Sequence, residues 1–145
     1  MLPRLCICTE IPQLETKCHL SLIVHAYEVR KPTNSGKLAT RCLTNSSLYV
    51  RGRLGEQWIQ DSFVDHASYQ PLVLFPSSDA ITLTQSFVAG LNKPIQLIVP
   101  DGNWKQASRM PKREPVLKNL LRVTLPLGEP SQYRLRKEHT PVGLG

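Results

Sequence analysis

Three features are missing from this sequence of 145 residues: a long apolar run, a C-x-x-C pair, and a repeat or low-complexity tract. Because no run approaches the ~20 apolar residues that a membrane helix needs, we expect no membrane partner. The first residues, MLPRLCICTEIPQ, also lack the apolar core of a secretory signal. These absences favour a cytoplasmic protein whose cysteines are reduced.

The cysteines do not show the spacing of a typical zinc site. Cys6 and Cys8 form a C-x-C pair, while Cys18 and Cys42 lie farther along the chain. Zinc sites usually use C-x-x-C pairs. We therefore predict buried or free thiols, with no metal ligands and no tightly held zinc.

The charge is basic and unevenly distributed. Eighteen Lys and Arg against eleven Asp and Glu give a net charge of +7. Residues 1–104 hold nine basic and eight acidic residues, whereas residues 105–145 hold nine and three, a net charge of +6. This asymmetry favours a nucleic-acid partner. The alternative interpretation is a solvated basic surface.

Strand-like and helix-like segments alternate along the chain. Apolar or β-branched runs predict strands at 20–29, 46–50, 71–75, 94–99 and 122–127. Helices are expected at about 36–43, at 80–90 with Ser78 or Asp79 as the cap, and at 104–110, where Pro111 must end or bend the helix. The alternation indicates an α/β fold, a mostly parallel sheet with helices on both faces.

Three loops follow predicted strands, at 32–36, 76–79 and 101–104. In a parallel sheet they would emerge at the same edge, where ligands collect. Their small and hydrogen-bonding residues suit a polar small molecule held by backbone N–H groups. The alternative is that all three are ordinary caps and turns. Within Tyr133–Lys137, an aromatic ring beside three cations could contact phosphates and stack a base.

Five motifs, in order along nearly the whole chain, resemble those of the DTW-domain family. They are LCIC at 5–8, E-x-x-K-P-T-N-S-G-K-L at 28–38, YQPLVLFPSS at 69–78, DGNW at 101–104 followed by Arg109, and YRLR at 133–136. Asp101 and Trp104 look like the ends of the D-x-T-W motif that names the family.

The resemblance implies a tRNA-uridine aminocarboxypropyltransferase. Such an enzyme uses S-adenosylmethionine to transfer a 3-amino-3-carboxypropyl group to N3 of a tRNA uridine, and it releases methylthioadenosine. The implied fold is SPOUT-like, with a C-terminal knot, and residues 1–145 would form a single domain that binds S-adenosylmethionine.

The resemblance also implies the residues of the site. Asp101 and Trp104 would be catalytic, with Asp101 acting as a base for the N3 proton or positioning the ammonium of the transferred group. Cofactor contacts would come from Phe75, Pro76, Ser77, Ser78, Asp101, Gly102, Asn103 and Leu144. Contacts with RNA would come from Asn34, Arg109, Tyr133, Arg134 and Arg136.

The sequence departs from the family pattern in three places. Asn103 stands where the motif usually has Thr, and the cysteine pair that relatives carry upstream of LCIC is absent. The chain also stops at Gly145, so we expect part of the family's C-terminal segment to be missing. Two other functions stay open: a SPOUT-like RNA methyltransferase, and a non-catalytic basic module that binds RNA.

Overall fold

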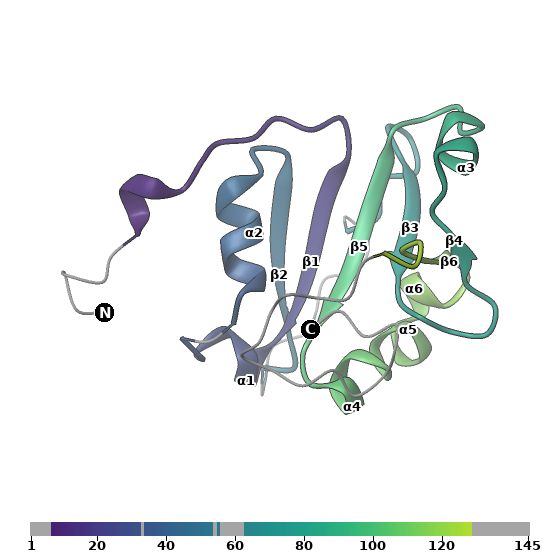
Figure 1. The fold of residues 1–145 in the computed structure, drawn as a ribbon. Coiled ribbons are helices and arrows are strands. Elements are labelled where there is room, and N and C mark those ends of the chain that lie inside the picture. The colour runs from purple at the N-terminus through teal and green to yellow at the C-terminus, as the bar shows by residue number, and fades with distance from the viewer. Residues whose placement is uncertain (1–6, 33, 54, 56–62, 129–145) are drawn as a thin grey trace.

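A computed structural model describes residues 7–32, 34–53, 55 and 63–128 (Figure 1). Six parallel strands form one sheet in the order β2-β1-β5-β3-β6-β4. The strands are β1 (His19–His25), β2 (Ser46–Arg51), β3 (Gln70–Leu74), β4 (Ile81–Thr82), β5 (Ile95–Asp101) and β6 (Leu121–Thr124). The predicted parallel α/β fold is confirmed.

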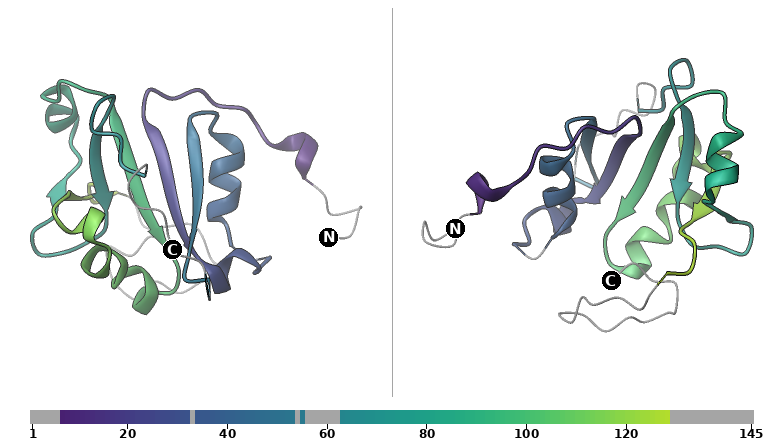
Figure 2. Two further views of the ribbon diagram at one scale, coloured as in Figure 1. Left: turned by 180° about the vertical axis from the view of Figure 1, so that it is seen from behind. Right: turned by 45° about the horizontal axis from the view of Figure 1, so that its top comes forward.

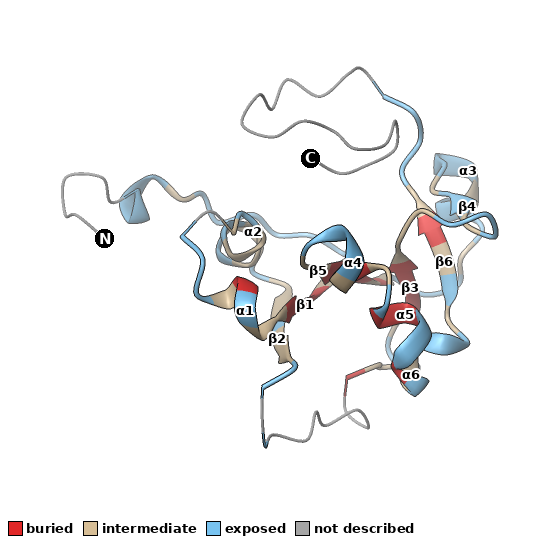
Figure 3. Cartoon of the chain, turned by 90° about the horizontal axis from the view of Figure 1, so that it is seen from below, coloured by how far each residue is buried: buried red, intermediate tan, exposed pale blue. Residues whose placement is uncertain are grey.

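The helices are short and lie on both faces of the sheet. They are α1 (Ala26–Val29), α2 (Gly36–Cys42), α3 (Gln85–Ala89), α4 (Trp104–Ala107), α5 (Met110–Arg113) and α6 (Pro115–Lys118), after a 3-10 turn at Cys8–Glu10. Seen along the strands in Figure 3, α2 lies on one side of the sheet, and α5 and α6 lie on the other. Among the described residues, no helix is long and apolar enough to cross a membrane.

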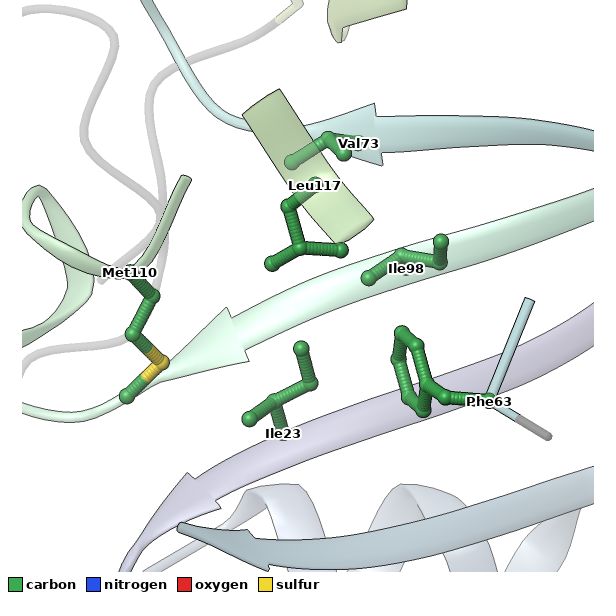
Figure 4. Close-up of a cluster of buried hydrophobic side chains, with 6 residues drawn as sticks. All are labelled: Ile23, Phe63, Val73, Ile98, Met110 and Leu117. Carbon is green, nitrogen blue, oxygen red and sulfur yellow. The ribbon is translucent and has the colours of Figure 1, made fainter. Parts of the chain in front are cut away.

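The main core lies between the central strands of the sheet and helices α5 and α6, which cover one of its faces. Six side chains make it up, each at most 1% exposed: Ile23, Phe63, Val73, Ile98, Met110 and Leu117 (Figure 4). Four successive residues of β1 are buried, because a central parallel strand is covered on both faces. Figure 2 shows β5 in the middle of the sheet, between β1 and β3, so its carboxyl end is surrounded by neighbouring loops.

Two predicted elements change type in the structure. The strand expected at 20–29 ends at His25, because the His25 side chain accepts a hydrogen bond from the backbone N–H of Tyr27 and starts α1 there. The prediction of a helix at 80–90 was wrong for the first half of this segment, where Ile81–Thr82 pairs with β6 as an edge strand. The helix begins only after Thr84, whose hydroxyl accepts from the N–H of Phe87 at 3.1 Å. Pairing with β6 therefore outweighs the helical periodicity of this segment.

The segment after β5 is two helices rather than the one helix expected at 104–110. Helix α4 ends at Ala107, and α5 begins at Met110 with Pro111 in its first turn. A proline is tolerated there because the first turn of a helix has no internal acceptor for its N–H. The knot that the resemblance implies stays a prediction, since the C-terminal residues from 129 lie outside the described part of the chain.

Candidate functional site

The three strand-end loops do meet at one edge of the sheet. Strand β5 lies between β1 and β3 and is parallel to both, so the segments that follow them leave on the same side. Figure 3 looks onto this edge, where α1 and α4 flank the ends of β1 and β5. In the register of the sheet, Asp101 stands opposite Val24, so the aspartate lies at the end of the central strand. This carboxyl edge is where open α/β sheets bind ligands.

Asp101 is held by a side chain from the first loop. The amide Nδ2 of Asn34 donates to Asp101 Oδ2 at 2.5 Å, and both residues are half-buried. The other end of the same amide, Asn34 Oδ1, accepts from the backbone N–H of Lys37 at 3.2 Å in the first turn of α2. Asn34 was expected to contact RNA, and the structure brings it to the proposed catalytic aspartate. The contact joins residues 67 positions apart in the sequence.

Local bonds explain why the first loop presents Asn34 in this way. Lys31 donates its backbone N–H to the Glu28 carbonyl at 3.0 Å and its Nζ to the buried Glu28 carboxylate at 2.7 Å. The N–H of Asn34 then donates to the carbonyl of Lys31 at 3.2 Å, and Lys37 Nζ donates to the carbonyl of Val29. Sequence reasoning missed the supporting roles of Glu28, Lys31 and Lys37, although all three lie in the quoted 28–38 motif.

Gly36 is required by the same contact. A Cβ at this position would lie 2.8 Å from Asp101 Oδ2 and 2.9 Å from a methyl carbon of Leu22, closer than real Cβ atoms come to a neighbour. It would also lie 3.4 Å from Asn34 Oδ1. The glycine therefore lets the start of α2 approach the carboxylate at the end of β5. This is close backbone packing, and its φ is not positive.

The second and third loops meet through their aromatic residues. Phe75 and Trp104 stack with ring centroids 5.3 Å apart and an interplanar angle of 30°. Trp104 is still 51% exposed, so much of the indole faces solvent at the same edge as Asp101. A large aromatic surface beside a carboxylate suits a ligand with both an apolar part and a positive charge.

Asn103 starts α4 with a capping box. Its Oδ1 accepts from the N–H of Gln106 at 2.9 Å, and Gln106 Oε1 accepts from the N–H of Asn103 at 2.9 Å. Asn and Thr both serve at such a cap, so the departure at position 103 preserves a local structural role. A Cβ at Gly102 would lie 3.0 Å from the Gln106 side chain, so glycine leaves room for the side chain that completes this capping box.

The loop at 76–79 is tied to the neighbouring strand by an ion pair. Arg122 Nη1 of β6 lies 2.6 Å from Asp79 Oδ2. A hydrogen bond from the Ser77 hydroxyl, and to a smaller extent the Arg122 charge, lowers the pKa of the Asp79 carboxyl from its ordinary value. Ser77, Ser78 and Asp79 are exposed, whereas Phe75 and Pro76 are half-buried. Asp79 was expected to cap a helix. In the structure it pairs instead with Arg122 and connects this loop to β6.

A comparison with protein families identifies the chain. The DTW domain matches residues 1–145. The chain belongs to the DTW-domain family. Curated relatives are named tRNA-uridine aminocarboxypropyltransferase 2: the protein of Macaca fascicularis is 25% identical over 141 residues and that of Mus musculus 24% identical over 143. Each match covers 94% of this chain and 47% of the relative, so the chain spans about half their length. No solved structure matches significantly.

In this DTW-domain chain, the predicted site residues fall into three groups. Asn34, Phe75 with the following loop at 76–78, and the 101–104 segment lie at the carboxyl edge. Arg109 is exposed and is the N-cap residue of α5, which follows α4. The remaining predicted residues, Tyr133, Arg134, Arg136 and Leu144, lie outside the described residues, as does Cys6. Within the described ranges, no three side chains that could bind a metal gather together, and Cys8, Cys18 and Cys42 form no disulfide.

Proposed function

We propose that this chain transfers the 3-amino-3-carboxypropyl group of S-adenosylmethionine to N3 of a uridine in tRNA, releasing methylthioadenosine. The observation that carries the proposal is the half-buried Asp101 carboxylate, oriented by Asn34 at 2.5 Å at the carboxyl edge of the sheet. The names of the two curated relatives support the same activity. The whole chain would then form one domain that binds S-adenosylmethionine.

The residues present suit this donor. S-adenosylmethionine combines an aromatic base with a sulfonium and an ammonium group. The stacked Phe75–Trp104 pair offers an aromatic surface, and Asp101 offers the negative charge that attracts a cation. Backbone groups of Pro76–Ser78, Gly102 and Asn103 would bind its adenosine or carboxylate. Leu144 would add a contact from the C-terminal segment. The donor supplies an electrophilic carbon next to a good leaving group.

The reaction forms one bond and breaks one bond. Uracil N3 bonds to the γ-carbon of the methionine moiety while the bond from that carbon to the sulfonium sulfur breaks, which leaves neutral methylthioadenosine. The N3 proton passes to a base. Asp101 acts in one of two ways: it takes this proton, or it binds the ammonium and fixes the direction of attack. In both roles Asn34 is a positioning residue, because it acts on the substrate only through Asp101.

The tRNA would be bound by basic side chains around this edge. Residues 105–145 carry a net charge of +6, and the exposed Arg109 follows Trp104 by five residues in the sequence. Tyr133, Arg134 and Arg136 complete the proposed RNA-binding set. Binding through phosphates releases counterions, so affinity should fall steeply with salt. Replacing Arg134 and Arg136 by Ala should reduce the slope of log K against log salt by up to about two.

The test incubates the chain with unmodified tRNA and S-adenosylmethionine and identifies the modified nucleoside and the by-product. Methylthioadenosine and an aminocarboxypropyl uridine are expected, whereas S-adenosylhomocysteine would indicate methyl transfer instead. Asp101→Asn keeps the shape and removes the charge, and it should lower the single-turnover rate by about 10²–10⁴-fold. Asp65→Asn is a matched control on the amino side of β3, where the carboxylate accepts from the N–H groups of Ala67 and Ser68. Loss of less than about threefold in Asp101→Asn would exclude a catalytic role.

A further inference from the structure

An aromatic pair, the half-buried His25 and the exposed Tyr27, stands at the same edge as Asp101 and has no part in the site described above. Tyr27 is 73% exposed, and its ring stacks on that of His25 with centroids 5.5 Å apart and an interplanar angle of 10°. Two rings that already lie nearly parallel, one of them largely in solvent, offer an aromatic surface on which an unpaired base can stack. We infer that the Tyr27–His25 pair is a stacking platform for a base of the RNA substrate.

The platform is held in place from two sides. The Nδ1 of His25 accepts from the backbone N–H of Tyr27 at 3.3 Å, so the histidine fixes the start of α1. On another side, a Cβ at Gly52 would lie 3.2 Å from His25 Nε2, and Gly52 has a φ of +83°. The imidazole is therefore confined between the Tyr27 ring and the backbone after β2. The Tyr27 ring lies nearly parallel to this confined imidazole, and most of its surface is open to solvent.

The platform lies within reach of the proposed reaction centre. Val24 pairs in register with Asp101, and Tyr27 follows Val24 by three residues. Adjacent strands are ~4.8 Å apart and each residue spans at most ~3.5 Å, so the two Cα atoms are at most about 15 Å apart. Figure 3 shows α1, which contains Tyr27, and α4 on either side of the ends of β1 and β5. A nucleotide that flanks a uridine at Asp101 can therefore reach Tyr27.

The charges around the platform favour RNA over an apolar partner. Arg30 and Arg53 are exposed within a few residues of Tyr27 or Gly52 along the chain, while the charge of the exposed Lys31 is paired with Glu28. Basic side chains bind the phosphates of a single strand, while aromatic rings stack its bases without strong sequence preference. The platform would thus hold an unpaired nucleotide beside the target. The inference rests on the proposed function, because the partner is the same RNA.

The test measures binding of the full chain to unmodified tRNA and to a single-stranded oligouridine by fluorescence anisotropy. Tyr27→Leu keeps apolar bulk and removes the ring. It should raise Kd by about 5- to 100-fold, the range for loss of one stacked base. Tyr27→Phe keeps the ring and should bind within about twofold of the original chain. The salt slope of Tyr27→Leu should not change, because a neutral side chain displaces no counterions.

Tyr69 provides a matched control, since it too contacts a histidine. Its ring lies 5.6 Å from that of His19, at the amino edge of the sheet, so Tyr69→Leu should leave RNA binding unchanged. The inference is overturned if Tyr27→Leu binds within about twofold of the original chain, if Tyr27→Phe loses as much as Tyr27→Leu, or if the chain binds no RNA. Binding that depends on Tyr27 without group transfer would refute the proposed function alone. Group transfer with unimpaired Tyr27→Leu would refute this inference alone.

Discussion

The amide of Asn34 makes two contacts that one substitution can separate. Its Nδ2 donates to Asp101 Oδ2 at 2.5 Å, while its Oδ1 accepts from the N–H of Lys37 at 3.2 Å. Asn34→Asp keeps the acceptor for Lys37 and turns the donor into a second carboxylate. A carboxylate oxygen can accept the Lys37 N–H as the amide oxygen does, so the first turn of α2 should form in the variant. The change therefore acts on the contact with Asp101.

The cost of this substitution follows from the separation. Two full charges 2.5 Å apart repel by about 6–7 kcal/mol at an effective dielectric constant of 20. Both residues are half-buried, so solvent screening, small movements and proton uptake by one carboxyl reduce this energy. We expect Asn34→Asp to lower the free energy of unfolding by about 2–4 kcal/mol, which includes the lost charge-assisted hydrogen bond of about 1.5–3 kcal/mol.

A reciprocal exchange separates stability from activity. In the double variant Asn34→Asp with Asp101→Asn, one amide and one carboxylate face each other again, so most of the lost stability should return. The carboxylate is then at position 34 and no longer at position 101, so group transfer should remain as low as in Asp101→Asn alone. Urea unfolding at neutral pH measures the first effect, and single-turnover transfer to tRNA measures the second.

Two outcomes would refute this reasoning. An Asn34→Asp variant within about 0.5 kcal/mol of the original chain would mean that the two side chains do not face each other in solution. A double variant that recovers transfer as well as stability would mean that the position of the carboxylate does not matter. Asp65→Asn serves again as the control for group transfer. Its carboxylate lies on the amino side of β3, so its loss should leave the single-turnover rate unchanged.

Three further predictions concern the same edge of the sheet. Gly36→Ala should lower the free energy of unfolding by about 1–3 kcal/mol in urea, because its Cβ would press on Asp101, whereas Gly90→Ala, whose Cβ meets only ordinary contacts, should not. Asn103→Ala should cost about 1 kcal/mol in the same assay through loss of the α4 cap, and Asn103→Thr should cost much less. The lowered pKa of Asp79 stabilises the fold above its ordinary value of 3.8. The difference in melting temperature between the original chain and Asp79→Asn should therefore be present at pH 7, shrink as the pH falls below 3.8, and vanish below the lowered pKa of the folded protein. An equal difference at low pH would contradict the last prediction.

The local pattern of the sequence determined most of the strands and the placement of the loops. The mainly apolar runs SLIV, PLVLF and PIQLIV supply most of the residues of β1, β3 and β5. Each is followed by turn residues, so the loops after them could be predicted to share an edge once the strands were taken as parallel. The helix predicted at 36–43 agrees with α2 (Gly36–Cys42) to within one residue. These features depend on residues close together in the chain.

The tertiary structure decided the contacts between segments. Asn34 meets Asp101 only because β1 and β5 are neighbours, and Phe75 meets Trp104 only because β3 lies on the other side of β5. Hydrophobic periodicity shows that a strand is buried but not which strands flank it. It also failed at Ile81–Thr82, where the available edge of β6 turns a helical pattern into a strand. Strand order is set by how all the apolar faces pack at once, so no local stretch of sequence determines it.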